Sequence, residues 1–595
     1  MKKGTGIGLL LLAIAAAVAS GRQSAKPNVS VAGLRRAEAA YWQFVQREGV
    51  LLRVRLGLPV DALPDLSLEK SERDASFGRS LSATLDGVRP GELSHEEELS
   101  VEILRREARE LAAGPSHYWL TFPATPYTFQ FLGVHTVFAS HPFRKKEDAD
   151  HYERLLAQYP AFVRSIEAKL QEQARRGIRM PRPEVSLVVG AFAPAAREPE
   201  SNLFRVAPER LAALPPADRE AFAARIAARI GGEIRPAVRR LTDFLTGEYA
   251  EKAPESVGLS QYPGGAEFYR ARVRRITTLD ISAEEIHRIG LEAMERINTQ
   301  LDEVRRKLRF EGSLADFRRF LKTDARFYAK APEQVGERLL EAQNRILPKI
   351  PDFFGRLPRA PFGVKRLEPA LEGAMTFGYY QVPTPADPKG YYKFNGADLE
   401  KRSLLGAGSL IAHELMPGHH LQINLQHENA ELPPWRREAL AFTAFVEGWG
   451  EYASFLAGEM GMYEDSYDLC GRLLFDAFLT SRLVVDTGMN LLGWPRARAM
   501  EYMRENTIQS DTEIETETLR YSSDLPAQAL AYKMGMRKFV ELRDKARTSL
   551  GPAFDMRRYH DMLLSSGAVP LDLAERKVDW FIAEEKARAA DRTIR

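Results

Sequence analysis

Apolar residues recur at helical spacing along most of the chain. The clearest case follows Ser282, which forms a predicted capping box with Glu285 at the start of a helix. From there, apolar side chains mark one helical face at Ile286, Ile289, Met294, Ile297, Leu301, Val304 and Leu308. Similar patterns, rich in alanine, arginine, glutamate and leucine, predict helices over 34–57, 94–113, 148–177, 216–250, 331–348, 403–428 and 438–459. We therefore expect a mainly α fold.

The pattern changes between about 355 and 396, where prolines cluster and aromatic and β-branched residues gather in short runs. The runs FGVKRL, MTFGYYQV and GYYKFN have the length of strands and predict a small antiparallel sheet just before a histidine-bearing helix. The edge of such a sheet can bind an extended peptide as an added strand. The candidates to line that path are Tyr379, Tyr380, Tyr391, Tyr392 and Asn395. A sheet that only covers the core is the alternative.

Composition narrows the class of protein. The 595 residues are 44% hydrophobic and 28% charged with a net charge of +3, so nothing favours binding to nucleic acid or to an anionic membrane. The single cysteine, Cys470, excludes an internal disulfide and a cysteine-rich metal cluster, and we expect it to be a buried thiol. We expect one structural body with a soft boundary near 275–282, which separates a helical part at 28–280 from a site-bearing part at 281–595.

The first residues resemble a signal peptide. Two lysines precede an apolar run from Ile7 to Ala19, and small residues at Ala17 and Ala19 suit cleavage, so 1–27 is predicted to be the leader and the mature N-terminus. The run is shorter than the roughly 20 residues of a membrane span. Because no cysteine follows it, lipid attachment through an N-terminal thioether is not expected. A periplasmic or secreted protein without a stable span is predicted, and an uncleaved anchor is the alternative.

The stretch HELMPGHHLQ, from His413 to Gln422, concentrates groups that bind metals. In HExxH, two histidines four residues apart share a helix face, but here Pro417 takes the place of the second histidine. Pro417 and Gly418 favour a local bulge that brings His419 to that place. We therefore predict His413 and His419 as ligands. His420 stays open as the alternative ligand, and the histidine that is not a ligand would contact substrate or support the site.

A later segment, FVEGWGEYA, supplies acidic partners. Glu447 is the predicted third ligand, and Glu451, four residues later on the same face, would orient a ligand histidine. Glu414 would be the general base for a zinc-bound water. Each part is weak alone, since adjacent histidines are often solvated or packed in a core, but the combination predicts a Zn²⁺ site of the gluzincin type.

These two segments resemble the bacterial domain-of-unknown-function 885 family, whose members are similar to gluzincin metallopeptidases. The resemblance continues through RLVVDTG at 482–488, RYSSDLPAQALAYKMG at 520–535 and FDMRRYHDMLLSSGAVPL at 554–571. It implies a large helical metallopeptidase-like fold, in which two helical halves form a substrate cleft around the zinc helix. Two departures stand out: Asn490 replaces a usual histidine, and Ala527 stands where the family more often has glycine.

The matching C-terminal segments suggest further site residues. Tyr521, Tyr532 and His560 are candidates to stabilise the oxyanion of an attacked amide, although packed tyrosines are common in cores. Arg520 and Lys533 could bind a substrate carboxylate, as a carboxypeptidase requires, or could form ordinary ion pairs.

Together these features predict a secreted zinc-dependent peptidase of carboxypeptidase or oligopeptidase type. It would hydrolyse short peptides through a water activated by Glu414. One alternative is a zinc hydrolase or lyase acting on a non-peptide amide. Another is a non-catalytic helical binding protein with a structural metal, which would have no use for a base at Glu414. The terminus recognised and the oligomeric state are not predicted.

Overall fold

The computed structural model describes residues 28–594 except 128, 373–376 and 385–386, so the predicted leader lies outside the described residues. Helices dominate, as expected. In the first half they are α2 (Val29–Glu48), α3 (Val50–Arg55), α4 (Leu68–Asp86), α5 (His95–His117), α6 (Phe129–Ser140), α7 (Lys146–Leu156), α8 (Tyr159–Arg175), α9 (Arg182–Ala196), α10 (Pro216–Arg229), α11 (Arg235–Phe244), α12 (Gly265–Thr277) and α13 (Ala283–Lys307).

The second half is also mainly helical. Its helices are α14 (Leu314–Thr323), α15 (Pro332–Ile346), α16 (Ile350–Phe353), α17 (Pro369–Glu372), α18 (Ala407–Glu414), α19 (His419–Glu428), α20 (Thr443–Leu456), α21 (Ser466–Asn490), α22 (Arg496–Asn506), α23 (Asp511–Leu519), α24 (Leu530–Leu550), α25 (Met556–Leu564) and α26 (Leu571–Ile594). No helix in the described part of the chain combines the length and apolar character that crossing a membrane requires.

The long helix predicted after Ser282 is α13. The Ser282 hydroxyl accepts a hydrogen bond from the amide of Glu285 at 3.1 Å, which satisfies one of the free N–H groups of the first turn. Its apolar face, from Ile286 to Val304, is buried and packs against α21. Four other predicted helices are divided: 34–57 falls on α2 and α3, 148–177 on α7 and α8, 216–250 on α10 and α11, and 403–428 on α18 and α19.

The predicted sheet exists, but its topology is mixed. Strands β1 (Phe362–Arg366), β2 (Gly378–Gln381) and β3 (Gly390–Phe394) lie in the order β1-β3-β2. β2 pairs with β3 antiparallel and β1 pairs with β3 parallel, so the expectation of a purely antiparallel sheet is wrong. Direction depends on how the chain returns between strands, and the residues of the strands themselves do not encode it.

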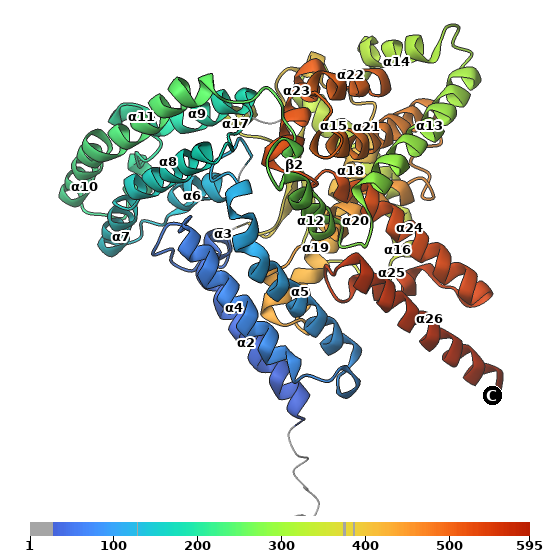
Figure 1. Ribbon diagram of the computed structural model, residues 1–595. Coiled ribbons are helices and arrows are strands. Elements are labelled where there is room, and N and C mark those ends of the chain that lie inside the picture. Colours follow the sequence, from blue (N-terminus) through green and yellow to red (C-terminus); the bar gives the residue numbers. More distant parts are fainter. Residues whose placement is uncertain (1–27, 128, 373–376, 385–386, 595) are drawn as a thin grey trace, which may run out of the picture.

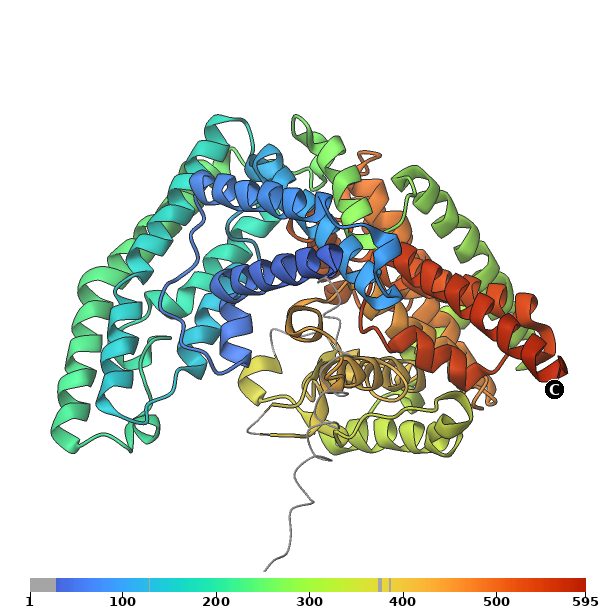
Figure 2. The same ribbon diagram turned by 90° about the horizontal axis from the view of Figure 1, so that it is seen from below.

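One large hydrophobic core joins the two parts of the chain, since a continuous cluster of buried side chains includes both Leu34 and Ile582. In Figure 1, α6 to α11 form the upper left lobe, α24 to α26 lie on the right, and α18, α19 and α20 lie between them. Figure 2, turned by 90°, again shows the teal and green helices α6 to α11 on the left and the red helices α24 to α26 on the right. The yellow segment that carries the sheet lies between them.

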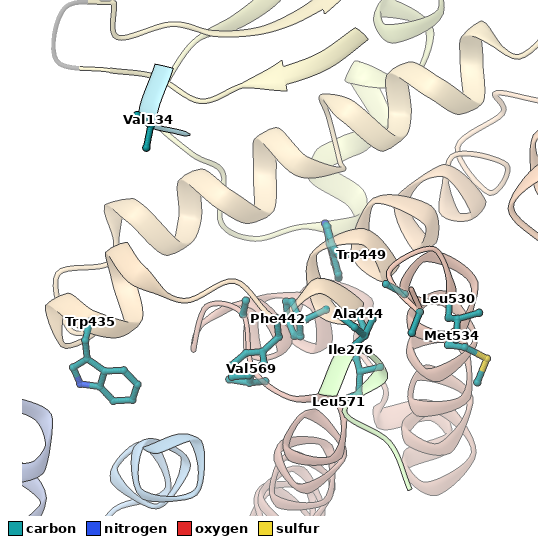
Figure 3. Close-up of a cluster of buried hydrophobic side chains, with 14 of the residues drawn as sticks. Val134, Ile276, Trp435, Phe442, Ala444, Trp449, Leu530, Met534, Val569 and Leu571 are labelled. Atoms are coloured by element: carbon teal, nitrogen blue, oxygen red, sulfur yellow. The ribbon is translucent and has the colours of Figure 1, made fainter. Parts of the chain in front are cut away.

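Helix α20 is held by a close crossing with α24. A Cβ atom added at Gly448 would lie 2.4 Å from the Cα of Gly535, so the two backbones touch at this point. Apolar side chains on both helices bury the rest of the contact, and Figure 3 shows Ala444 near Leu530 in this cluster. The crossing fixes the height and rotation of α20, which carries Glu447 next to Gly448.

Candidate metal centre

Helices α18 and α19 are separate because the chain breaks between Leu415 and Gly418. Pro417 has no N–H to continue the helical ladder, and Gln343 of α15 compensates by bonding both backbone groups of Met416, at 2.9 and 3.1 Å. The indole of Trp449 donates to the carbonyl of Pro417 at 2.9 Å. The predicted bulge within one helix is therefore wrong: a sharp turn starts a new helix at His419.

The turn brings His413, His419 and Glu447 together. The Nε2 atoms of His413 and His419 lie 3.5 and 3.4 Å from the same oxygen, Oε2 of Glu447. One donor atom from each residue falls in a group in which all separations are within 4.8 Å. For a tetrahedral zinc ion with bonds of 2.0–2.1 Å, neighbouring donors stand about 3.3–3.4 Å apart. The donor types and their spacing therefore fit a divalent ion such as zinc.

The charges of His413 and Glu447 depend on each other. Burial alone would lower the pKa of His413, but the neighbouring carboxylates of Glu447 and Glu451 raise it to about 10. Burial would raise the pKa of Glu447, yet its hydrogen bonds with His413 and His419 hold it well below its usual range. At neutral pH Glu447 is therefore an anion, as a metal ligand must be, whereas His413 carries a proton that it must release when an ion binds.

Glu451 and Arg472 lie behind the candidate ligand His413. Oε2 of Glu451 lies 3.8 Å from Nδ1 of His413, and Arg472 of α21 forms an ion pair with the other oxygen at 2.7 Å. Both charged side chains are buried. A Cβ atom at Gly450 would stand 2.8 Å from the His413 imidazole, so this glycine leaves the ring room to lie on α20. Arg472 was not expected from the sequence, where its only signal is a charge within the apolar pattern of a helix.

Replacing Glu451 by glutamine is expected to weaken metal affinity about 10- to 100-fold, as is usual when a group that orients a ligand is lost. The change also leaves the buried Arg472 without its counter-ion, so the melting temperature should fall as well. Competition with a fluorescent chelator measures the first effect, and calorimetry measures the second. A variant with wild-type metal affinity would show that Glu451 does not orient His413.

Glu414 lies beside the ligand cluster. Burial raises the pKa of its carboxyl, while the neighbouring His419 and His413 lower it, and the backbone amide of Tyr380 donates a hydrogen bond to it. A carboxylate with a raised pKa is better suited to accept a proton near neutral pH. The bond from Tyr380 also means that the outer edge of β2 faces Glu414.

His420 lies outside the cluster, and both of its ring nitrogens have protein partners. Nε2 donates to the carbonyl of Ala360 at 3.0 Å, so Nδ1 is the acceptor for the hydroxyl of Tyr380 at 2.9 Å and the amide of Asn424 at 3.3 Å. Burial lowers its pKa to about 4. His420 therefore ties α19 to β1 and β2, and the geometry leaves His419 as the second candidate ligand.

Of the three candidate oxyanion donors, only Tyr532 reaches the cluster. Its ring stacks on the His413 ring with centroids 6.0 Å apart. Tyr521 is fully buried in an apolar cluster with Val485 and Met489. His560 is also fully buried: Nδ1 donates to the carbonyl of Phe353 at 2.9 Å, and Nε2 accepts from Tyr452 at 2.8 Å.

The other predicted site residues, Lys533, Arg520 and Asn395, also differ in burial and in their partners. Lys533 is buried and forms an ion pair with Asp476. Arg520 donates to the side-chain oxygen of Gln528 at 2.7 Å and remains partly exposed. Asn395 is buried, where it donates to the carbonyl of Glu372 at 2.7 Å. The structure therefore leaves Arg520, but not Lys533, able to meet a ligand.

Asn490 and Ala527, the two departures from the family pattern, lie next to each other in the fold. The amide of Asn490 donates to the carbonyl of Tyr521 at 2.6 Å, and its oxygen accepts from the amide of Leu259 at 3.0 Å. Ala527 has a φ of 69°, in the left-handed region that favours glycine. Its amide bonds Asp486 at 3.1 Å, which helps to hold this conformation. Both residues therefore organise the segment that carries Arg520.

An apolar pocket of about 100 Å³ opens beside α18 and α21. Its lining includes Leu410 of α18, Phe394 of β3, and Leu474 and Phe475 of α21. The Phe475 ring lies 6.3 Å from the His413 ring, centroid to centroid. The pocket is thus separated from the ligand cluster by one aromatic side chain.

Comparisons with known proteins agree with this fold. No curated protein matches the chain. The crystal structure of a candidate lipoprotein from Colwellia psychrerythraea superposes with a TM-score of 0.85 at 24% identity, covering 93% of this chain and 99% of the other. A candidate lipoprotein of unknown function from Shewanella oneidensis gives 0.70 at 16% identity, covering 91% and 99%.

At these identities the two structures are evidence for the fold alone. The family comparison adds evidence of relationship: the profile for bacterial proteins of unknown function, DUF885, matches residues 51–578. That match includes both histidine-bearing helices, α20 and the segment around Arg520. The chain therefore belongs to the DUF885 family of bacterial proteins of unknown function.

Proposed function

We propose that this protein is a zinc-dependent peptidase that hydrolyses short peptides. The observation that carries the proposal is the spacing of three buried or partly buried donors, two imidazole nitrogens at 3.5 and 3.4 Å from one carboxylate oxygen. The residues that would hold the ion are His413, His419 and Glu447. A carboxyl group that is not one of the three, Glu414, lies against the same histidines, and a purely structural zinc site has no need of it.

A bound zinc ion would lower the pKa of a coordinated water and polarise the carbonyl under attack. Glu414 takes the proton from the attacking water and returns it to the leaving amine, which its raised pKa favours. Glu451 and Arg472 hold the His413 ring in place. Tyr532, packed against that ring, is the donor closest to where an oxyanion would develop.

Two features support a peptide as the substrate. The outer edge of β2 faces Glu414, so an extended chain added to this edge would pass the base. The apolar pocket beside Phe475 offers a place for an apolar side chain of such a peptide. A folded protein has no free strand to offer, so short or unfolded peptides fit best.

The proposal includes a periplasmic or secreted location. The two solved structures of the same fold are candidate lipoproteins, a class of protein that acts outside the cytoplasm. The N-terminal segment of this chain has the lysines, apolar run and small residues of a signal peptide. Fractionation of the native host would locate the protein directly.

Metal analysis combined with a peptide digest tests the function. We expect about one zinc ion per chain and cleavage of a mixed peptide pool, seen by mass spectrometry. Chelation should abolish cleavage and added zinc should restore it, because the ion supplies the reactive water. An intact peptide pool together with cleavage of a small non-peptide amide would assign the site to a different hydrolase. Full activity of metal-free protein would refute the proposal.

A further inference from the structure

We infer that Arg520 binds the free C-terminal carboxylate of the substrate, so that the enzyme acts as a carboxypeptidase. This inference rests on the proposed peptidase function and adds the end of the peptide that is recognised. The elements involved are α21, α23 and the segment Arg520–Asp524, which continues α23.

Two guanidinium groups share one carboxylate near the metal centre. Oε2 of Glu517 lies 2.9 Å from Arg482, while Oε1 of the same residue lies 3.6 Å from Arg520. The pair with Arg482 is close and buried, and the contact with Arg520 is longer than a hydrogen bond. Two guanidinium charges thus share one carboxylate, so Arg482, Arg520 and Glu517 together have a net charge of +1.

Among the described residues, no carboxylate other than Glu517 forms an ion pair with Arg482 or Arg520, although Glu447 and Asp524 act on them from a longer distance. Lys533 is paired with Asp476, and Arg472 is paired with Glu451, so both pairs are neutral overall. Asp524 accepts hydrogen bonds from the hydroxyl of Thr125 and from the amide of Tyr127, and no ion pair joins it to Arg520 among the described residues. An anionic ligand is the natural partner for the remaining charge.

Exposure distinguishes the two arginines. The Arg482 side chain is 6% exposed and lies over the Phe478 ring at 4.4 Å, whereas the Arg520 side chain is 23% exposed. Arg482 is therefore enclosed, and Arg520 is the group that a ligand can reach. A guanidinium can bind a carboxylate through two parallel hydrogen bonds, which suits the end of a peptide.

The site lies one aromatic ring from the metal ligands. Arg520 lies beside the hydroxyl of Tyr532, where it opposes the rise in pKa that burial causes, and the ring of Tyr532 stacks on His413 with centroids 6.0 Å apart. The guanidinium of Arg482 lies 4.6 Å from the centroid of the same ring. A carboxylate bound at Arg520 would thus lie close to the scissile bond, as removal of C-terminal residues requires.

The first half of the chain holds this segment in position. The hydroxyl groups of Ser522 and Ser523 donate to Glu184 of α9, and Tyr127 bonds Asp524 from the segment before α6. Fixing Arg520 before the substrate arrives reduces the entropy lost on binding. An endopeptidase, which binds the middle of a chain, would gain nothing from such a fixed cation.

The test compares one short peptide with a free C-terminus and the same peptide with a C-terminal amide. For the wild type we expect kcat/KM to be at least about tenfold higher for the acid, in line with a hydrogen bond between charged groups. Arg520→Gln should remove this preference, so that the ratio of kcat/KM for the acid to that for the amide falls to about one while zinc content stays at wild type. The matched control is Arg537→Gln, an exposed arginine on α24, which should keep the preference.

Binding provides a second readout that does not require turnover. In the Glu414→Gln background, calorimetry with the acid and the amide should show tighter binding of the acid, and Arg520→Gln should abolish the difference. Equal turnover and equal affinity for both peptides, or a preference that survives Arg520→Gln, would overturn the inference. If no peptide is cleaved at all, the peptidase proposal fails, and the binding comparison still decides whether Arg520 recognises a carboxylate.

Discussion

Glu414→Gln is expected to lower kcat for peptide hydrolysis by about 10²–10⁴-fold, the usual contribution of a general base, while zinc content stays unchanged. Glu414 contacts the ligand histidines but is not one of the three donors, so its loss should spare the ion. The amide oxygen of glutamine can still accept the hydrogen bond from Tyr380, so β2 should keep its place. Steady-state kinetics and metal analysis on the same preparation measure both results.

The control for this variant is Glu431→Gln, the same change at an exposed position after α19. It should leave activity and zinc content at wild-type values. Undiminished hydrolysis by Glu414→Gln would exclude the role of general base. Loss of zinc from the same variant would instead make Glu414 a ligand and would require a different trio from His413, His419 and Glu447.

That His413, His419 and Glu447 lie close together could be predicted from the sequence, because their positions depend largely on local spacing. His413 and Glu447 each fall on a helix whose periodicity is clear, and Glu451 follows one turn later on the same face. Local spacing alone does not decide between His419 and His420. The choice depends on how the chain turns at Pro417, and that turn is stabilised by Gln343, a residue about 70 positions earlier.

Partners from distant parts of the chain are what the sequence does not reveal. Arg472 lies on α21, and nothing in the spacing of FVEGWGEYA indicates that it neutralises Glu451. Lys533 was predicted to be a possible carboxylate receptor, but it faces Asp476, a residue of α21. In both cases the ion pair depends on how α21 packs against the neighbouring helices. Local periodicity does not encode that packing.

The sheet shows the same limit. Three runs of aromatic and β-branched residues were enough to predict the strands, because strand propensity is a local property. Their order and direction follow from the connections, and β1 reaches β3 only after the chain has passed through α17 and β2. The parallel pairing places Ala360, just before β1, where its carbonyl accepts a hydrogen bond from His420.

Separate alanine substitutions at His419 and His420 are expected to have opposite consequences for the metal. Changes to groups that only orient a ligand cost about 10- to 100-fold in affinity, so loss of a direct ligand in His419→Ala should cost more than about 100-fold and abolish hydrolysis. His420→Ala should retain zinc, because both ring nitrogens of His420 already bind Ala360 and Tyr380. Zinc affinity by chelator competition compares the two variants directly.

The His420→Ala variant should instead loosen the contact between α19 and the sheet. Tyr380 would lose one hydrogen-bond partner and keep Asn424, at 2.9 Å. Because the amide of Tyr380 also bonds Glu414, we expect a lower melting temperature and a moderate loss of kcat with the zinc ion still bound. If His420→Ala lost the metal and His419→Ala kept it, the ligand assignment would be reversed, and α19 would have to rotate to present His420 to Glu447.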